Sequence, residues 1–304
     1  MLFTLVVLYV IGLLFFAIDR IVIKGKWEYV IFFMCLYLPF YIAILSIVYQ
    51  ATGSTAVVAV FQYLKELVLG LGMISLIAYH KDPFGHVLRL NIVDRLFLVF
   101  SGLATLYVFL PLGDASFLNK LIYLKNIFLM GILYFFGRNT IFNAGEIDRL
   151  FKFIMYIAIA AFCLNVLETV INTHFQQFTG YAAFNYAVNG MEPSGNYGLA
   201  WTFETQTMAK RLASFFSDPL DLASSCLMGF AVGLIWYLTT KREDASFYLL
   251  VMLATVGSLA FSSSRAAFAS FFIMVFFIAI VFKLYRLLAL GAGLFVFFCL
   301  FMVF

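Results

Sequence analysis

Charged side chains are scarce in this chain of 304 residues: Asp, Glu, Lys and Arg together make up 11%, whereas hydrophobic residues make up 65%. A soluble domain carries about 25% charged residues. The composition therefore excludes an ordinary soluble protein, and no part of the chain is polar enough to be a separate soluble domain. The net charge of +4 is too small to indicate a nucleic-acid-binding surface, so no nucleic acid is expected as a partner.

Motifs for metals and nucleotides are also missing. The three histidines form no His-Glu-x-x-His motif and no Cys/His cluster, and there is no Walker A or other Gly-rich nucleotide loop. The four cysteines all lie in apolar runs, where they are interpreted as small core residues. We therefore expect no metal and no cofactor, and an ATP-driven pump or a metalloprotease has no support.

Long apolar runs are what the chain does contain. A helix needs about 20 apolar residues to cross the hydrocarbon core, and the runs do not alternate as barrel strands do. The prediction is an all-α polytopic bundle that forms one transmembrane domain over residues 1–304. Its ten expected spans are 2–18, 29–49, 60–79, 96–112, 121–137, 150–170, 219–238, 246–261, 266–282 and 287–304. Pro39 lies within the second span and is expected to kink it.

The basic residues predict the orientation, because Lys and Arg concentrate in short cytoplasmic loops. With ten spans, 13 of the 19 basic residues lie on one side. The six on the other side are Lys65, Lys120, Lys125, Lys210, Arg211 and Arg265. Both ends of the chain and its one long loop, 171–218, are therefore predicted to be extracytoplasmic. The chain stops inside an apolar run without a polar flank, so we expect a fragment truncated at its C-terminus; the alternative is a real end at the membrane surface.

Two predicted outward segments combine an arginine with a helix start. Asp218 suits an N-cap, Pro219 suits the first helical position, and Asp221 follows three residues after the cap. Arg211 just before this helix N-terminus suits a phosphate; the alternative is a structural ion pair of Arg211 with either aspartate. In Ser-Ser-Ser-Arg265, a serine can cap the next helix. A cation in its first turn opposes the helix dipole, which predicts that Arg265 serves an anion or an acidic partner.

Lysines and the long loop add weaker candidates. Lys65 and Lys125 each end a Tyr-Leu-Lys triplet, where the lysine either snorkels to the interface or holds an anion in a polar cavity. The loop is rich in aromatic and amide side chains, which suit a carbohydrate and equally an interfacial helix. Its aromatic residues are Phe175, Phe178, Tyr181, Phe184, Tyr186, Tyr197, Trp201 and Phe203. His174 in the loop and Glu168 near the outer end of the sixth span are candidate acid–base groups.

Two of these segments resemble a known family. Residues 211–223, Arg-Leu-Ala-Ser-Phe-Phe-Ser-Asp-Pro-Leu-Asp-Leu-Ala, resemble the segment of the O-antigen ligase and O-antigen polymerase (Wzy-like) superfamily that reads roughly R-x-x-x-F-x-(N/D)-P before a long helix. Residues 259–269, Leu-Ala-Phe-Ser-Ser-Ser-Arg-Ala-Ala-Phe-Ala, are similar to its second hallmark, an apolar helix ending in S-R-(G/A)-A. The resemblance covers 60–304 and is densest in 211–282.

The resemblance implies an enzyme of the bacterial inner membrane. Such proteins transfer glycan from an undecaprenyl-pyrophosphate carrier at the outer face, in lipopolysaccharide or exopolysaccharide biosynthesis, without a nucleotide or a required metal. A ligase passes the glycan to a lipid A core or to protein, and a polymerase passes it to another lipid-linked unit. Arg265 and Arg211 would then stabilise the pyrophosphate. The residues implied for substrate binding are Lys65, Lys125, Asp218 and Asp221.

The chain departs from the family's pattern after the tenth expected span. Members carry a second large outward loop there, with an important histidine or arginine, and this chain stops at that point. If the protein ends at residue 304, we expect that the catalytic base is missing or is His174 or Glu168. Two other functions stay open: a peptidoglycan polymerase of the RodA/FtsW kind, with Glu192 or Glu204 as base, and a lipid-linked sugar transporter or flippase, which needs a polar pathway. A structural membrane partner without catalysis is the last alternative.

Overall fold

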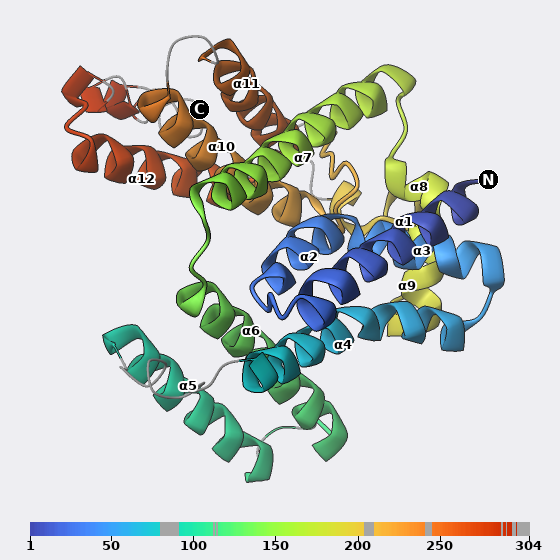
Figure 1. Cartoon of the computed structure of the whole chain (residues 1–304). Coiled ribbons are helices and arrows are strands. Elements are labelled where there is room, and N and C mark those ends of the chain that lie inside the picture. The colour runs from blue at the N-terminus through green and yellow to red at the C-terminus, as the bar shows by residue number, and fades with distance from the viewer. Residues whose placement is uncertain are drawn as a thin grey trace. The chain divides into compact units, whose positions relative to one another are not determined.

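The computed structural model of the protein describes residues 1–79, 91–111, 113, 115–203, 210–240, 245–286, 288–289, 291–293 and 296 (Figure 1). All regular structure in these residues is helical. A helix satisfies its own backbone groups, which lipid cannot do. Eight helical segments among the described residues are long and apolar enough to cross a membrane. These observations confirm the predicted all-α class and indicate a multi-pass protein whose partner is the lipid bilayer.

The predicted spans correspond closely to these helices. They are α1 with η1 (Leu2–Ala17, Ile18–Ile23), α2 to α3 (Tyr29–Tyr37, Tyr41–Thr52), α4 (Thr55–Tyr79), α5 (Ile92–Phe109), α6 (Phe117–Asn139), α7 (Ala144–Ile171), α10 (Pro219–Thr239) and α11 (Ala245–Ser262). A ninth, α12 (Arg265–Val281), is shorter. Most of the predicted tenth span, 287–304, lies outside the described residues.

The expected kink at Pro39 is confirmed as a break in the α-helix. The 3₁₀ turn η2 (Leu38–Phe40) separates α2 from α3, because proline has no N–H to donate and its ring clashes with the preceding turn. The long loop also contains regular structure. Its elements are α8 (Phe175–Thr179), α9 (Tyr181–Asn189), η3 (Asn196–Gly198) and η4 (Ala200–Phe203).

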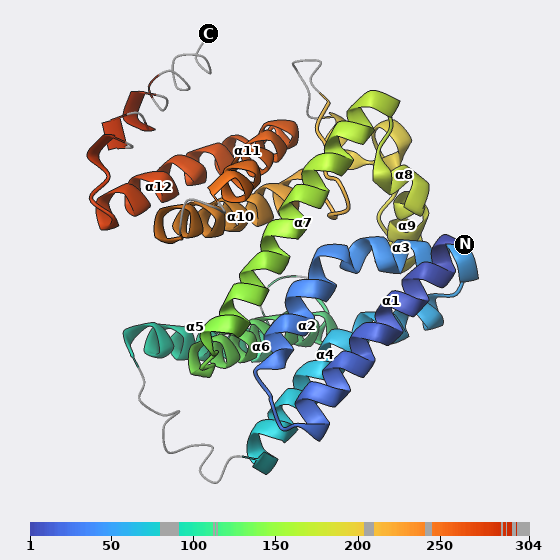
Figure 2. The same cartoon turned by 45° about the horizontal axis from the view of Figure 1, so that its top comes forward.

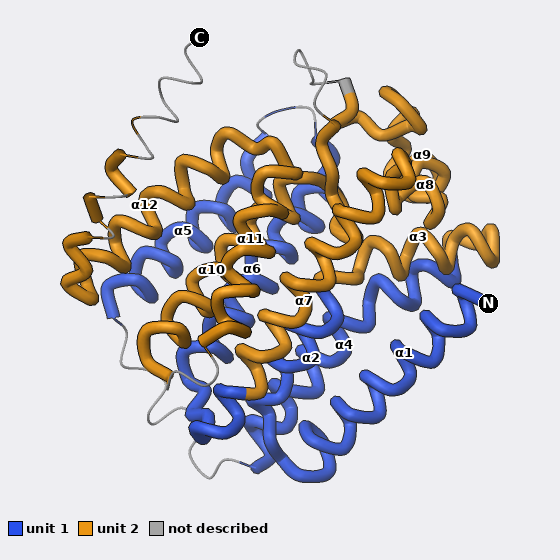
Figure 3. Tube along the Cα trace, turned by 90° about the horizontal axis from the view of Figure 1, so that it is seen from above, with its two compact units in different colours: residues 1–38, 56–148 blue, residues 39–55, 149–304 orange. Residues whose placement is uncertain are grey.

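The chain divides into two compact units, shown in different colours in Figure 3. Unit 1 comprises residues 1–38 and 56–148, and unit 2 comprises residues 39–55 and 149–304. In unit 1, several charged side chains at helix ends are paired. Glu146 accepts hydrogen bonds from Tyr29 Oη at 2.8 Å and from Lys26 Nζ at 3.3 Å. Pairing offsets the cost of removing such groups from water.

The N-terminus of α5, in unit 1, is also stabilised by paired polar and charged side chains. Asn91 caps α5 and Asp94 completes a capping box with it. The buried Asp94 carboxylate also forms an ion pair with Arg138 and accepts a hydrogen bond from Tyr134 Oη at 3.0 Å. One carboxylate thus stabilises a helix start and joins α5 to α6.

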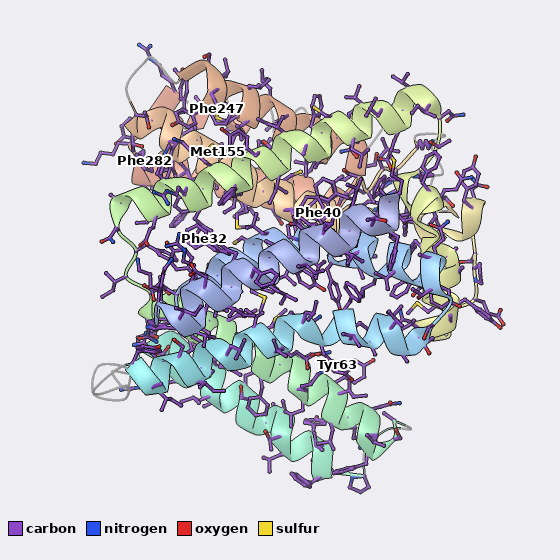
Figure 4. The ribbon with its side chains drawn as sticks, turned by 45° about the vertical axis from the view of Figure 1, so that its right-hand side comes forward. Phe32, Phe40, Tyr63, Met155, Phe247 and Phe282 are labelled. Atoms are coloured by element: carbon purple, nitrogen blue, oxygen red, sulfur yellow. The ribbon has the colours of Figure 1, made fainter. Side chains whose placement is uncertain are left out.

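In unit 2, α10 packs against both α11 and α12 (Figure 2). Met155 of α7, which is fully buried, forms a core cluster with Val232, Tyr248 and Val251, and Phe247 packs against it (Figure 4). Small residues allow close approach, as is usual between membrane helices. A Cβ on Gly229 would lie 3.0 Å from Thr255 Cγ2 and 3.1 Å from Ala158 Cβ.

The long loop of unit 2 packs on α3 through α8 and α9. The Phe184 ring, which is 2% exposed, lies 6.5 Å from the ring of Tyr49. Gly180 joins α8 to α9 with φ +72°, and a Cβ there would lie 3.2 Å from the Gln50 side chain. The turn therefore requires glycine both for its left-handed backbone and for its contact with α3.

Two glycines of α4 provide a test of the packing in unit 1. A Cβ on Gly72 would lie 2.3 Å from the buried Val30 Cγ2 and 3.1 Å from Phe136 Cζ, whereas nothing lies within 4 Å of a Cβ on Gly70. Gly72→Val should therefore destabilise the protein by about 1–3 kcal/mol through overpacking. Thermal melting of detergent-solubilised protein, followed by size-exclusion chromatography, should show a lower midpoint for Gly72→Val than for Gly70→Val. Equal midpoints for the two variants would contradict the described packing.

Candidate functional site

The candidate site lies at the loop end of unit 2, which we define as the end where α7 and α11 finish and α10 and α12 begin. One backbone hydrogen bond and one side-chain hydrogen bond join segments that are distant in sequence. Leu212 N donates to Phe261 O at 3.0 Å, and Arg211 Nε donates to Ser262 O at 3.2 Å. The first arginine segment therefore lies against the turn that carries the second, although the two are 51 residues apart.

The turn between α11 and α12 presents Arg265. Ser263 adopts a left-handed backbone with φ 49°, and Ser264 Oγ accepts a hydrogen bond from Ala267 N at 3.3 Å as the N-cap of α12. Both the predicted serine cap and the position of Arg265 in the first turn are confirmed. Arg265 is exposed, and no ion pair or hydrogen bond engages its guanidinium within the part of the chain that the structure describes. Its charge is thus open to an external anion.

The start of α10 confirms the other predicted cap. Asp218 Oδ1 accepts hydrogen bonds from Leu220 N and Asp221 N, both at 2.8 Å, and Pro219 is the first helical residue. The Asp221 carboxylate accepts a hydrogen bond from Ser217 Oγ. The contacts of both aspartates are those of a helix start, which requires oxygen acceptors for its unpaired N–H groups.

Glu168, near the end of α7, and His174, near the start of the long loop, are both buried. Glu168 is 3% exposed, and its Oε1 accepts a hydrogen bond from Phe175 N at 2.6 Å. His174 is 2% exposed, and burial together with the nearby Lys210 ammonium lowers its pKa to about 4. An imidazole with that pKa is neutral near pH 7 and is a weak base there. Of the two candidate bases, His174 is therefore the less suited at neutral pH.

No role for Lys210 was predicted from the sequence. It was only counted among the six basic residues expected on the extracytoplasmic side. Its Nζ donates to Asn172 Oδ1 at 3.3 Å and to Thr173 O at 3.2 Å. Burial lowers the pKa of Lys210, and the Glu168 carboxylate raises it. Lys210 also lines a cavity of about 440 Å³ with Asn172, Asn196 and Tyr197. The only signal in the sequence was its place beside Arg211, ahead of a helix start.

The aromatic residues of the loop divide into buried and exposed members. Phe184 and Trp201 are 2% and 9% exposed and belong to the core, where Trp201 packs with Leu199 and Ala213. The exposed members are Phe178, Tyr186 and Tyr197. Glu204, one of the two glutamates considered as a base, lies outside the described residues.

The two candidate lysines belong to unit 1. Lys125 Nζ forms an ion pair with Glu66 Oε1 at 2.8 Å and lies 5.4 Å from the centre of the Tyr63 ring, labelled in Figure 4. Glu66 was not predicted from the sequence as the partner of Lys125. Lys65 is half-buried on α4, next to Glu66. The charge of Lys125 thus has a protein partner, unlike that of Arg265 among the described residues.

No protein-family model, no curated protein and no solved structure matches this chain. Its function is therefore argued from the residues at the loop end.

The cap at Asp218 gives a prediction that separates geometry from charge. Asp218→Ala should lower the free energy of unfolding by about 1 kcal/mol, because two N–H groups lose their acceptor, whereas Asp218→Asn should stay close to the parent because asparagine caps equally well. Thermal melting in detergent measures both variants. A loss in Asp218→Asn as large as that in Asp218→Ala would show that the negative charge, not the cap, matters.

His174 should make the stability depend on pH. Its pKa is about 4 in the fold against the usual 6.5, so the unfolded chain binds more protons between these values. The contribution of the neutral His174 to stability is complete above pH 6.5 and is lost as the pH falls towards 4. The melting temperature of the parent should therefore drop more steeply over this window than that of His174→Gln, and parallel curves would contradict the buried neutral imidazole.

Proposed function

We propose that this protein is a glycosyltransferase that moves glycan from an undecaprenyl-pyrophosphate carrier to an acceptor, as an O-antigen or exopolysaccharide ligase or polymerase, at the outer face of a bacterial inner membrane. The observation that supports the proposal most directly is the contact of Arg211 with Ser262 O. This contact unites the two segments that resemble the Wzy-like superfamily. A phosphate site formed by both Arg211 and Arg265 requires these two segments to lie together.

The chemistry of the site suits a pyrophosphate. Arg265 is the first residue of α12, beside N–H groups at the positive end of the helix dipole. The start of α10 belongs to the same loop end, and Arg211 precedes it by a few residues. Guanidinium groups bind phosphate oxygens through paired hydrogen bonds. The unfavourable position of Arg265 for capping is explained if its ligand is anionic.

In the proposed reaction, an acceptor hydroxyl oxygen attacks the anomeric carbon of the carrier-linked sugar. The bond between that carbon and the pyrophosphate oxygen breaks, and the pyrophosphate leaves with the electron pair. Arg265 and Arg211 stabilise the charge that develops on it, as fixed cations do in a site with little water. A base takes the hydroxyl proton, and Glu168 suits this role better than His174, because the lowered pKa of His174, about 4, makes its imidazole a weak base near pH 7.

The test is a deletion in the host, complemented with the full-length protein or its variants, followed by gels of acceptor-linked and lipid-linked glycan. Arg265→Ala should lower transfer by about 100-fold or more, the usual effect of removing a stabilising group at a developing charge. The matched control is Arg286→Ala, which removes an exposed cation beyond the opposite end of α12. Immunoblots of membranes verify equal amounts of protein.

The pattern of glycan distinguishes the functions. Single units on the acceptor without a long ladder indicate a polymerase, and long chains retained on the carrier indicate a ligase. Arg211→Ala should also abolish transfer, but its contact with Ser262 means that a folding defect must be excluded by melting. Normal transfer in both arginine variants would sink the proposal, and the transporter or structural alternatives would then take its place.

A further inference from the structure

A polar cavity of about 440 Å³ lies in the long loop, apart from the exposed guanidinium of Arg265. The described residues that line it are Asn172, Asn196, Tyr197 and Lys210. Small-molecule sites commonly measure about 300–1,000 Å³, with aromatic surface and a few polar groups that fix orientation. The lining combines two amides, one ammonium and one aromatic ring, so its volume falls within this range while its described lining is more polar than that of most such sites.

One lining residue of the cavity has an unfavourable backbone conformation. Tyr197 has a left-handed backbone, with φ 58°, which is rare for an aromatic residue and persists only where the surroundings impose it. The left-handed backbone of Asn172 is that of an ordinary helix C-cap, because Thr173 N donates to Glu168 O and Asn172 N donates to Thr169 O at the end of α7. Strain concentrates at ligand sites, and here it falls on Tyr197.

Neighbouring residues impose the conformation of the 195–198 turn. Asn196 N donates to Thr202 Oγ1 at 2.7 Å. Gly198 has φ +74°, and a Cβ there would lie 2.7 Å from Ala182 Cβ on α9. The turn is therefore fixed against the body of the loop, while the Tyr197 side chain is left 51% exposed. A rigid turn that exposes an aromatic ring provides a preorganised binding surface.

One unsatisfied polar atom lies close to the cavity. The ring centre of buried His174 is 6.2 Å from that of Tyr197. Its Nδ1 is buried without a hydrogen-bond partner among the described residues. Buried polar atoms are normally paired with protein, water or ligand. The neighbourhood thus has hydrogen-bonding capacity beyond what its own side chains use.

We infer that this cavity binds a sugar ring, with hydroxyl groups on the amides of Asn172 and Asn196 and on the Lys210 ammonium, and with an apolar ring face on Tyr197. Amides both donate and accept hydrogen bonds, which matches hydroxyl groups. A phosphate fits less well, because Lys210 supplies the one cation among the described lining residues, and two of its three N–H groups already donate to protein oxygens. The third N–H group is enough for a single sugar hydroxyl. The inference rests on the proposed function only for where the sugar comes from. If that function holds, the sugar is a unit of the glycan that is transferred or of the glycan that accepts it.

Binding is tested directly with the full-length protein in nanodiscs, by saturation-transfer difference NMR. The probes are the methyl glycosides of glucose, galactose, N-acetylglucosamine and glucuronic acid. Saturable binding of at least one probe is expected, weakened about ten-fold or more by Tyr197→Ala, because the apolar platform is lost. Asn196→Ala is the second variant, since it leaves the strained residue unchanged. Tyr186→Ala, which removes another exposed aromatic ring of the same loop, is the matched control and should bind normally.

The outcomes separate this inference from the proposed function. Arg265→Ala should lose glycan transfer yet keep sugar binding, because its guanidinium is not among the described lining residues. If Arg265→Ala transfers normally but Tyr197→Ala loses binding, the pyrophosphate site fails and the sugar site stands. If no probe binds saturably, or if Tyr197→Ala and Asn196→Ala bind like the parent, the sugar site is overturned whatever the transfer assay shows.

Discussion

The loop end of unit 2 depends on the pairing of a short extended segment with the end of α11. The last carbonyl groups of a helix have no partner within the helix, and a chain outside regular structure needs partners for its own polar groups. Leu212 N and Arg211 Nε meet both needs by donating to Phe261 O and Ser262 O. This pairing fixes where Arg211 lies, where α10 can begin, and how close it stands to the turn that carries Arg265.

The other side of the same segment is held by polar side chains. Gln176 Nε2 donates to the carbonyl oxygens of Ser214 and Phe216, both at 2.7 Å. Lys210 donates to Asn172 and Thr173, at the end of α7. Residues 210–216 are thus fixed between the α8 region and α11. These hydrogen bonds offset the cost of burying the polar groups, and they also position the backbone of the site.

Two basic residues of unit 1 have acidic partners, whereas Arg265 of unit 2 has none among the described residues. In unit 1, the ion pairs of Lys125 with Glu66 and of Arg138 with Asp94 join neighbouring helices. At the loop end of unit 2, the exposed Arg265 has no such partner among the described residues, and it stands at a helix N-terminus where a cation is unfavourable. An exposed cation at this position is consistent with an anionic ligand.

Features that depend on neighbouring residues could be predicted from the sequence. Span length, the break at Pro39 and the caps at Asp218 and Ser264 follow from lipid thickness, the missing proline N–H and unpaired helix N–H groups, all of which act within a few residues. Three further features could not be predicted and come from the folded arrangement: the contact of Arg211 with Ser262, the ion pair of Lys125 with Glu66, and the place of Lys210 in the lining of a cavity. These contacts join residues that lie far apart in the chain, and their geometry comes from helix packing. The apolar side chains that drive this packing are so alike along the sequence that they do not specify which helix meets which.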